Sequence, residues 1–223
     1  MAFFRIGHRG AAGLEPENTL VSIQRAIDLG VDAVEFDVHM SKDGAVVVIH
    51  DDTVERTTNG SGAVSEMTLA ELKALDAGKG ERIPTLLEVI GLAKGRVKMV
   101  IELKGADTEE PVVRIVEEKD IASEVIVISF NHDRVKRVKE LNPKIRTGIL
   151  IVGAPVYPSH LVKDASADNI HPNLNFVDRE FVEEAHRSGI HVSVWNADTV
   201  EDIKKMKGLG VDSIGSNYPN LLG

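Results

Sequence analysis

The stretch Ala33-Val34-Glu35-Phe36-Asp37-Val38 decides what fold and what chemistry this chain is expected to have. Its Val and Phe residues recur with a period of two, which predicts a buried strand. Glu35 and Asp37 are two residues apart and therefore project from the same face of that strand. Two buried carboxylates repel each other, so they require a shared proton, cationic partners or a divalent metal. We favour a metal site; the alternative is two acids at a strand end that face water.

The composition predicts one soluble globular domain spanning residues 1–223. Of its 223 residues, 43% are hydrophobic and 27% are charged, which suits a sizeable core without a stably inserted membrane segment. The formal net charge of −9 argues against nucleic acid as a partner. The absence of cysteine excludes thiolate metal sites. No signal-peptide pattern is seen at the start, so a cytoplasmic location is expected. The sequence does not disclose the oligomeric state.

His50 is expected to lie close to this acidic strand. Asp43-Gly44 lies between two apolar runs, which is a strong hairpin signal. The second run, 45–50, is therefore predicted to pair antiparallel and to bring His50 towards Asp37. An imidazole beside carboxylates is a candidate general acid or base, and the alternative is a histidine that caps a turn.

Two further strands end in charged or polar residues that are suited to catalysis or ligand binding. Ile6-Gly7-His8-Arg9-Gly10 ends the first strand, and the planar guanidinium of Arg9 suits a phosphate or carboxylate; the alternative is a polar surface loop. In the strand 97–104, Glu102 and Lys104 alternate to one face, which adds a third acid and a cation. The alternative for this pair is a salt bridge on an edge strand.

The alternation of strands and helices predicts a (β/α)8 TIM barrel. Apart from the return strand, the parallel strands are expected to begin near residues 4, 33, 98, 125, 145, 167, 190 and 211. Residues 51–82 are expected to form a small insertion after the second strand, and residues 152–165 a loop with one helical turn. The second choice is a doubly wound open sheet, but the glycine motifs that bind nucleotides in such sheets are missing.

A barrel places catalytic groups at the carboxyl ends of its strands, and the candidate residues lie there. They are His8, Arg9, Glu35, Asp37, Glu102, Lys104, His171, Trp195, Asn196, Ser216 and Asn217. Three acids, two histidines and two cations at one rim indicate metal-assisted chemistry on an anion.

The order of these motifs resembles that of the glycerophosphodiester phosphodiesterase family, over the whole chain and most densely in its first half. The matching motifs are His8-Arg9-Gly10, Pro16-Glu17-Asn18-Thr19, Glu35-Phe36-Asp37, Lys42-Asp43-Gly44, Val48-Ile49-His50-Asp51, Arg56-Thr57-Thr58-Asn59-Gly60, Pro84-Thr85-Leu86 and Ile101-Glu102-Leu103-Lys104. The resemblance implies hydrolysis of small-molecule glycerophosphodiesters to sn-glycerol 3-phosphate and an alcohol.

The resemblance also implies roles for individual residues. Glu35, Asp37 and Glu102 would bind Mg²⁺ or Ca²⁺, His8 and His50 would act as acid and base, and Arg9 and Lys104 would hold phosphate oxygens. Trp195 is expected to form an apolar wall for glycerol, with rim packing as the alternative.

Several points stay open at this stage. They are the assignment of acid and base, the nucleophile (water or the substrate's own glycerol hydroxyl) and the preferred alcohol. One departure is Asn217, in the run Ser216-Asn217-Tyr218-Pro219, where the family commonly has Asp.

Two rival functions use the same barrel. Another metal-dependent lipid phosphodiesterase, phospholipase-like, would need access to a bilayer, and no amphipathic basic helix is seen. A non-catalytic phosphodiester-binding barrel would not need both His8 and His50.

Overall fold

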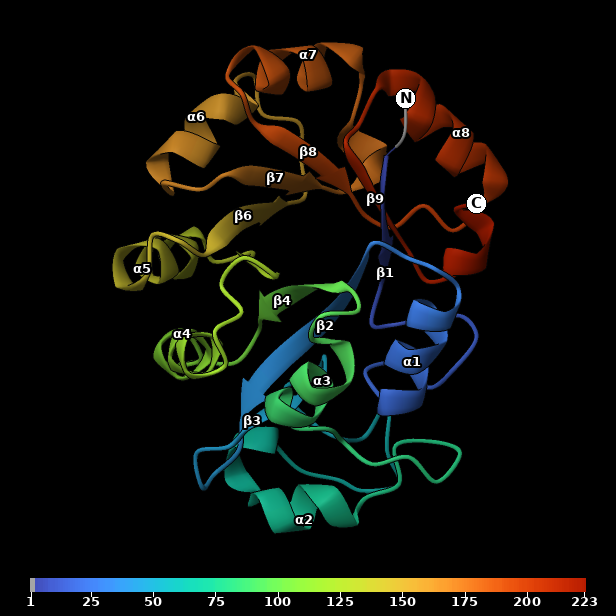
Figure 1. Ribbon diagram of the computed structural model, residues 1–223, viewed down its shortest axis with the longest axis vertical. Coiled ribbons are helices and arrows are strands. Elements are labelled where there is room, and N and C mark those ends of the chain that lie inside the picture. The colour runs from blue at the N-terminus through green and yellow to red at the C-terminus, as the bar shows by residue number, and fades with distance from the viewer. Residues whose placement is uncertain (1–2) are drawn as a thin grey trace.

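The computed structural model describes residues 3–223, which form a closed barrel of parallel strands surrounded by helices (Figure 1). Strand β1 pairs with both β9 and β2, and these two contacts close the ring. Within the described residues the parallel strands are β1 (Phe4–Gly7), β2 (Ala33–Met40), β4 (Lys98–Leu103), β5 (Val125–Ser129), β6 (Arg146–Ile151), β7 (Asn169–Pro172), β8 (His191–Val194) and β9 (Ser213–Ser216). The predicted (β/α)8 barrel is confirmed.

The antiparallel return strand is also present. Strand β3 (Val46–Val48) pairs with the end of β2, and Val46 lies opposite Met40. Gly44 closes the turn with a φ of 84°, a left-handed conformation that glycine adopts without steric cost. The hairpin returns the chain after β3 to the level of Asp37, where the Ile49 N–H donates to the Asp37 carbonyl at 3.1 Å.

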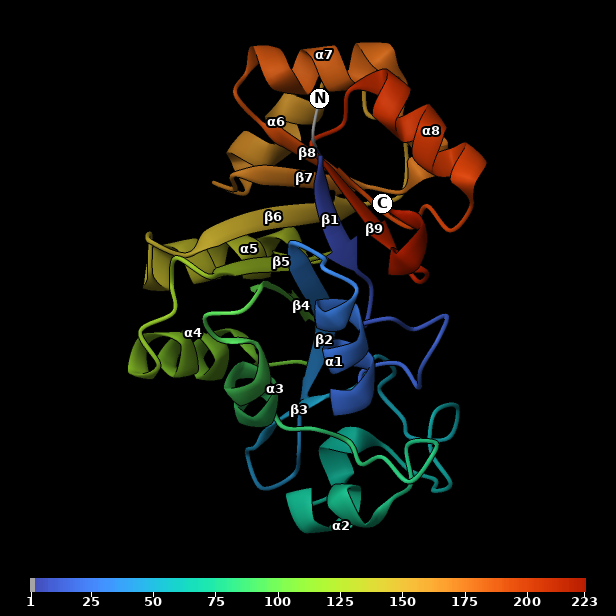
Figure 2. The same cartoon turned by 45° about the vertical axis from the view of Figure 1, so that its right-hand side comes forward.

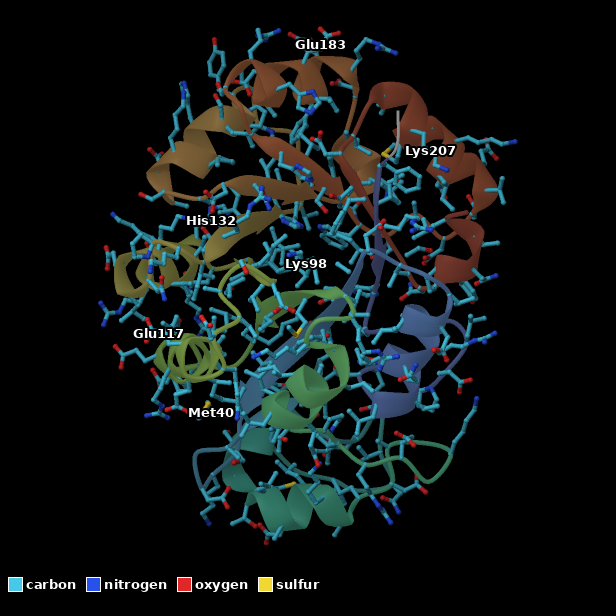
Figure 3. The ribbon with its side chains drawn as sticks, viewed as in Figure 1. Met40, Lys98, Glu117, His132, Glu183 and Lys207 are labelled. Atoms are coloured by element: carbon cyan, nitrogen blue, oxygen red, sulfur yellow. The ribbon has the colours of Figure 1, made fainter. Side chains whose placement is uncertain are left out.

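Helices cover the outside of the barrel, as the two views show (Figures 1 and 2). They are α1 (Leu20–Asp28), α3 (Leu86–Ala93), α4 (Glu109–Glu118), α5 (His132–Leu141), α6 (Pro158–Asp164), α7 (Arg179–Arg187) and α8 (Val200–Leu209). Their outer faces are charged: Glu117 on α4 and Glu183 on α7 lie on the outside of the molecule (Figure 3).

Helix α6 corrects the expectation for residues 152–165. The loop with a single turn is instead a seven-residue helix that begins at Pro158. Proline was interpreted as a loop signal, but its fixed φ suits the first turn of a helix. Ser159 and Val162 are buried, so tertiary packing stabilises a helix that its short sequence does not announce.

The insertion between β3 and α3 has its own small core. It contains the 3₁₀ helix η1 (Val64–Glu66) and helix α2 (Leu69–Ala74), and Thr68 and Glu71 form a capping box at the start of α2. Val54, Val64 and Leu72 pack together against β3. The insertion therefore lies beside the barrel, at the end of the molecule away from α7 (Figure 2).

Two short 3₁₀ helices, η2 (Leu174–Phe176) and η3 (Pro219–Leu221), complete the described chain. Inside the barrel, an apolar layer that includes Ile6, Ala33, Val100, Ile128 and Leu150 fills the space below the rim. Among residues 3–223, no helix has the length and apolar character needed to cross a lipid bilayer.

Candidate active site

Three buried carboxylates meet where β2 and β4 end side by side. The parallel register places Asp37 directly opposite Glu102, and Glu35 lies one side-chain repeat earlier on the same face of β2. One oxygen of each carboxylate lies within 4.8 Å of the others. The three residues are only 5%, 0% and 6% exposed for Glu35, Asp37 and Glu102. The predicted acidic cluster is therefore a compact group that is shielded from water.

The charges of this cluster are not balanced by protein groups alone. Burial, followed by the charges of Asp37 and Glu102, holds the pKa of Glu35 well above its usual value. Burial and the neighbouring Asp37 raise the pKa of Glu102 to about 7. Glu35 Oε1 and Asp37 Oδ1 have no hydrogen-bond partner among the described residues. Clustered carboxylate oxygens that lack partners are the donor set that a hard divalent cation uses, so these residues fit such an ion.

Two cationic side chains border the cluster. Arg9 Nε lies 3.4 Å from Asp37 Oδ2, and Lys104 Nζ lies 2.9 Å from Glu102 Oε1. Arg9 has a φ of 48°, which is uncommon outside glycine, and its backbone N–H donates to Glu35 Oε2 at 2.9 Å. The charges that could hold an anion are thus fixed beside the acids.

His8 is oriented by a relay that the sequence did not reveal. Asp198 accepts from the side-chain amide of Asn217 at 2.6 Å, which leaves Asn217 Oδ1 to face His8 Nδ1 at 2.7 Å. Since this oxygen can only accept, Nδ1 carries the proton; Nε2 then carries the lone pair and lies 3.4 Å from the side-chain amide nitrogen of Asn196 and 3.8 Å from Glu35 Oε2. Burial and the charge of Arg9 lower the pKa of His8 to about 4. Asn217 therefore lacks the charge of the Asp that the family commonly has at this position. Asp198 supplies a carboxylate that contacts Asn217 on the side away from His8.

His50 has a charged partner instead. Its Nδ1 lies 2.5 Å from Asp51 Oδ1, and Arg56 holds Asp51 through two contacts of 2.7 and 2.8 Å. Arg56 also binds Glu17, which accepts from Arg9 at 2.8 Å. The hydrogen bonds from Arg56, and secondarily from His50, hold the pKa of Asp51 well below its usual range. One ionic network therefore joins His50 to the phosphate-binding candidate Arg9.

A cavity of about 290 Å³ connects these groups. It is lined by both histidines and both cations, by Glu35 and Glu102, and by an aromatic wall. In that wall the rings of Phe130 and Trp195 meet edge to face, with centroids 5.6 Å apart. All the residues expected to form the site thus lie at one rim; Asp37 is not in the lining itself but completes the acidic cluster behind it. His171 and Asn196 also line the cavity, whereas Ser216 binds Asp198 behind it.

Sequence reasoning missed the residues that orient the site rather than line it. Asn18 donates to Asp37 Oδ2 at 2.8 Å, and Glu17, Asp51 and Arg56 form the ionic network. The adjacency of His50 and Asp51, with an arginine five residues later, was a usable signal. Asp198 had none, because its contact with Asn217 depends on how β8 and β9 are placed in the ring.

Comparison with known proteins agrees with this geometry. The glycerophosphoryl diester phosphodiesterase family matches residues 8–221. A glycerophosphodiester phosphodiesterase of Caldanaerobacter subterraneus is 39% identical over 97% of this chain and 95% of its own. A phosphodiesterase of Oleispira antarctica, solved with its product sn-glycerol 3-phosphate, is 31% identical with a TM-score of 0.91, covering 98% of this chain and 94% of its own. This chain therefore belongs to the glycerophosphoryl diester phosphodiesterase family.

Proposed function

We propose that residues 1–223 form a single phosphodiesterase domain that cleaves glycerophosphodiesters to sn-glycerol 3-phosphate and an alcohol. The observation that carries this proposal is one cavity that joins two oriented histidines, two cations and a buried acidic cluster. The product complex of the Oleispira relative supports the same substrate class. The cytoplasmic location expected from the N-terminal sequence stays a prediction.

Glu35, Asp37 and Glu102 would hold the divalent cation, Mg²⁺ or Ca²⁺. Bound there, such an ion would polarise a phosphoryl oxygen and offset developing negative charge. Arg9 and Lys104 flank the acids and would bind the remaining phosphate oxygens, because a diester anion attracts these cations. Trp195 would form the apolar wall against which the glycerol carbons pack.

The hydrogen-bond partners of the two histidines suggest which acts as the general base and which as the general acid. His8 is hydrogen-bonded through Nδ1 to a neutral amide, which leaves the lone pair on Nε2 and suits a general base that takes a proton from the nucleophile. His50 is hydrogen-bonded through Nδ1 to the carboxylate of Asp51, which fixes the ring and leaves Nε2 to protonate the leaving alkoxide as a general acid. A barrel that only binds phosphodiesters would have no use for two histidines held by partners of different charge.

The test uses the purified chain with glycerophosphocholine and Mg²⁺ or Ca²⁺, with and without a chelator. We expect release of sn-glycerol 3-phosphate that stops when the chelator removes the metal. His50→Ala should abolish turnover, while His160→Ala, at an exposed position on α6, serves as the matched control. Tight binding without turnover by the unaltered protein would instead support a non-catalytic barrel. Full activity in His50→Ala would remove His50 from the mechanism.

A further inference from the structure

His39 is a buried histidine to which the proposed reaction assigns no role. It lies on β2, two residues after Asp37, and therefore projects from the same face of the strand as the acids. The residue is only 7% exposed and does not line the active-site cavity, whereas His50 does. Any effect of His39 on the reaction must therefore pass through a neighbouring group rather than through contact with a ligand in that cavity.

The neighbouring group is the backbone of His50. The ring Nε2 of His39 lies 3.0 Å from the His50 carbonyl oxygen. Because a carbonyl oxygen can only accept, Nε2 carries the proton and donates it. Within residues 3–223, no second hydrogen bond reaches this carbonyl. The peptide group that joins His50 to Asp51 therefore has His39 as its one carbonyl partner in the described chain.

This peptide group determines where the side chains of His50 and Asp51 point. Adjacent residues of an extended chain project to opposite sides, so their side chains do not meet. Here the chain bends over residues 50–52, and His50 Nδ1 lies 2.5 Å from Asp51 Oδ1. Rotation of the peptide group would change ψ of His50 and φ of Asp51 and would separate the imidazole from the carboxylate that orients it. A donor bound to this carbonyl opposes that rotation.

The side chain of His39 is itself confined by the segment that follows β4. A Cβ added at Gly105 would lie 2.8 Å from His39 Cα and 3.1 Å from its Nδ1, so only glycine leaves room for the ring. The Gly105 N–H donates to the Val38 carbonyl at 3.0 Å, and Arg134 on α5 donates to the Gly105 carbonyl. The backbone that confines His39 is thus bound both to β2 and to α5.

A backbone hydrogen bond attaches the same hairpin segment to β2 without His39. The Ile49 N–H donates to the Asp37 carbonyl at 3.1 Å, and β3 pairs with β2 just before it. Neither contact involves the side chain of His39. Replacement of that side chain should therefore leave the hairpin intact and release only the peptide group between His50 and Asp51.

We propose that His39 is a positioning residue for the general acid His50, an inference that rests on the proposed phosphodiesterase function. It holds the His50 carbonyl, and through it the pairing of the imidazole with Asp51. The alternative is that His39 only fills space beside Gly105, in which case a ring without a donor would serve equally well. The proposal requires an N–H donor at the place of Nε2.

Three variants separate the donor of His39 from its volume. His39→Gln places an amide N–H near the position of Nε2, whereas the shorter side chain of His39→Asn falls short of it, and His39→Phe keeps a ring without a donor. His132→Phe is the matched control. His132, labelled in Figure 3, also directs its Nε2 at a backbone carbonyl, that of Leu150, at 3.1 Å.

The first measurement is steady-state hydrolysis of glycerophosphocholine with Mg²⁺. His39→Asn and His39→Phe should lower kcat about 10-fold, because a displaced general acid reaches the leaving oxygen less often. KM should change by less than about 2-fold, since the proposed binding groups are untouched. His39→Gln should restore most of kcat, and His132→Phe should leave it unchanged.

The second measurement is proton NMR and needs neither substrate nor metal. The Nδ1 proton of His50 is held in a short hydrogen bond to a carboxylate, so it should resonate far downfield, and its loss in His50→Ala assigns it. The signal should persist in His39→Gln and His132→Phe. In His39→Asn and His39→Phe it should shift upfield or broaden, although thermal unfolding shows that the variants are folded.

Two results would overturn the proposal. One is an unchanged kcat and an unchanged His50 resonance in folded His39→Phe; the other is a loss in His39→Gln equal to that in His39→Phe. If His39→Phe does not fold, His39→Asn decides in its place. Failure of the unaltered protein to hydrolyse glycerophosphocholine would contradict the proposed function instead, and the NMR comparison would still test the link between His39 and His50.

Discussion

Replacement of Glu102 by Gln should stabilise the metal-free protein and reduce the stabilisation that a bound metal provides. The pKa of Glu102 rises from 4.5 to about 7 because the side chain is buried next to Asp37. An acid with a raised pKa contributes stability that is present below pH 4.5 and lost as the pH rises through 7, because the unfolded chain releases the proton first. Without metal, the unaltered protein is therefore penalised at pH 8.

The size of the effect follows from this change in pKa. Each pKa unit corresponds to about 1.4 kcal/mol, so the penalty at pH 8 approaches about 3 kcal/mol. Glu102→Gln removes the charge and should therefore recover most of this free energy. The recovery is reduced by the loss of the ion pair with Lys104. For a chain of this length, Tm should rise by roughly 5–10 °C. At pH 5 the two proteins should differ much less, because Glu102 is already largely protonated there.

The assay is thermal unfolding at pH 5 and pH 8, with a chelator or with Mg²⁺ or Ca²⁺. At 100 times its Kd, a metal should stabilise the unaltered protein by about 2.7 kcal/mol, and the variant by much less. Glu118→Gln, at an exposed position on α4, is the control for the same chemical change. The reasoning would be refuted if Glu102→Gln shifted Tm equally at both pH values, or if metal stabilised both proteins alike.

The ionic network and the helix caps lead to three further predictions. Asp51→Asn should lower kcat about 10- to 100-fold in steady-state assays, because His50 loses the partner that orients its ring, whereas Asp52→Asn on the exposed neighbour should leave kcat unchanged. Arg56→Lys should lower kcat severalfold in steady-state assays, since lysine cannot reproduce the paired contacts of the guanidinium; an unchanged kcat would show that the network is dispensable. Thr85→Ala should cost about 1 kcal/mol in urea unfolding, with kcat unchanged, because it removes the cap of α3.

Local patterns in the sequence were enough for the strands and most helices. The period-two alternation around Glu35 and Asp37 and the Asp43-Gly44 turn predicted β2, β3 and their antiparallel pairing. These patterns involve only a few neighbouring residues, so the sequence alone is enough to recognise them. Helix α6 was missed for the opposite reason, because its stability comes from packing Val162 against the rest of the protein.

The sequence alone determined which residue types reach the rim, since strand order and the carboxyl ends of strands follow from the alternating elements. Only the tertiary structure decided how those residues pair. His8 receives its orientation from Asn217 and Asp198, which lie about two hundred residues away along the chain. His171 lies on the strand opposite the acidic cluster because the ring closes between β1 and β2. Contacts of this kind depend on ring closure and register, which no local pattern encodes.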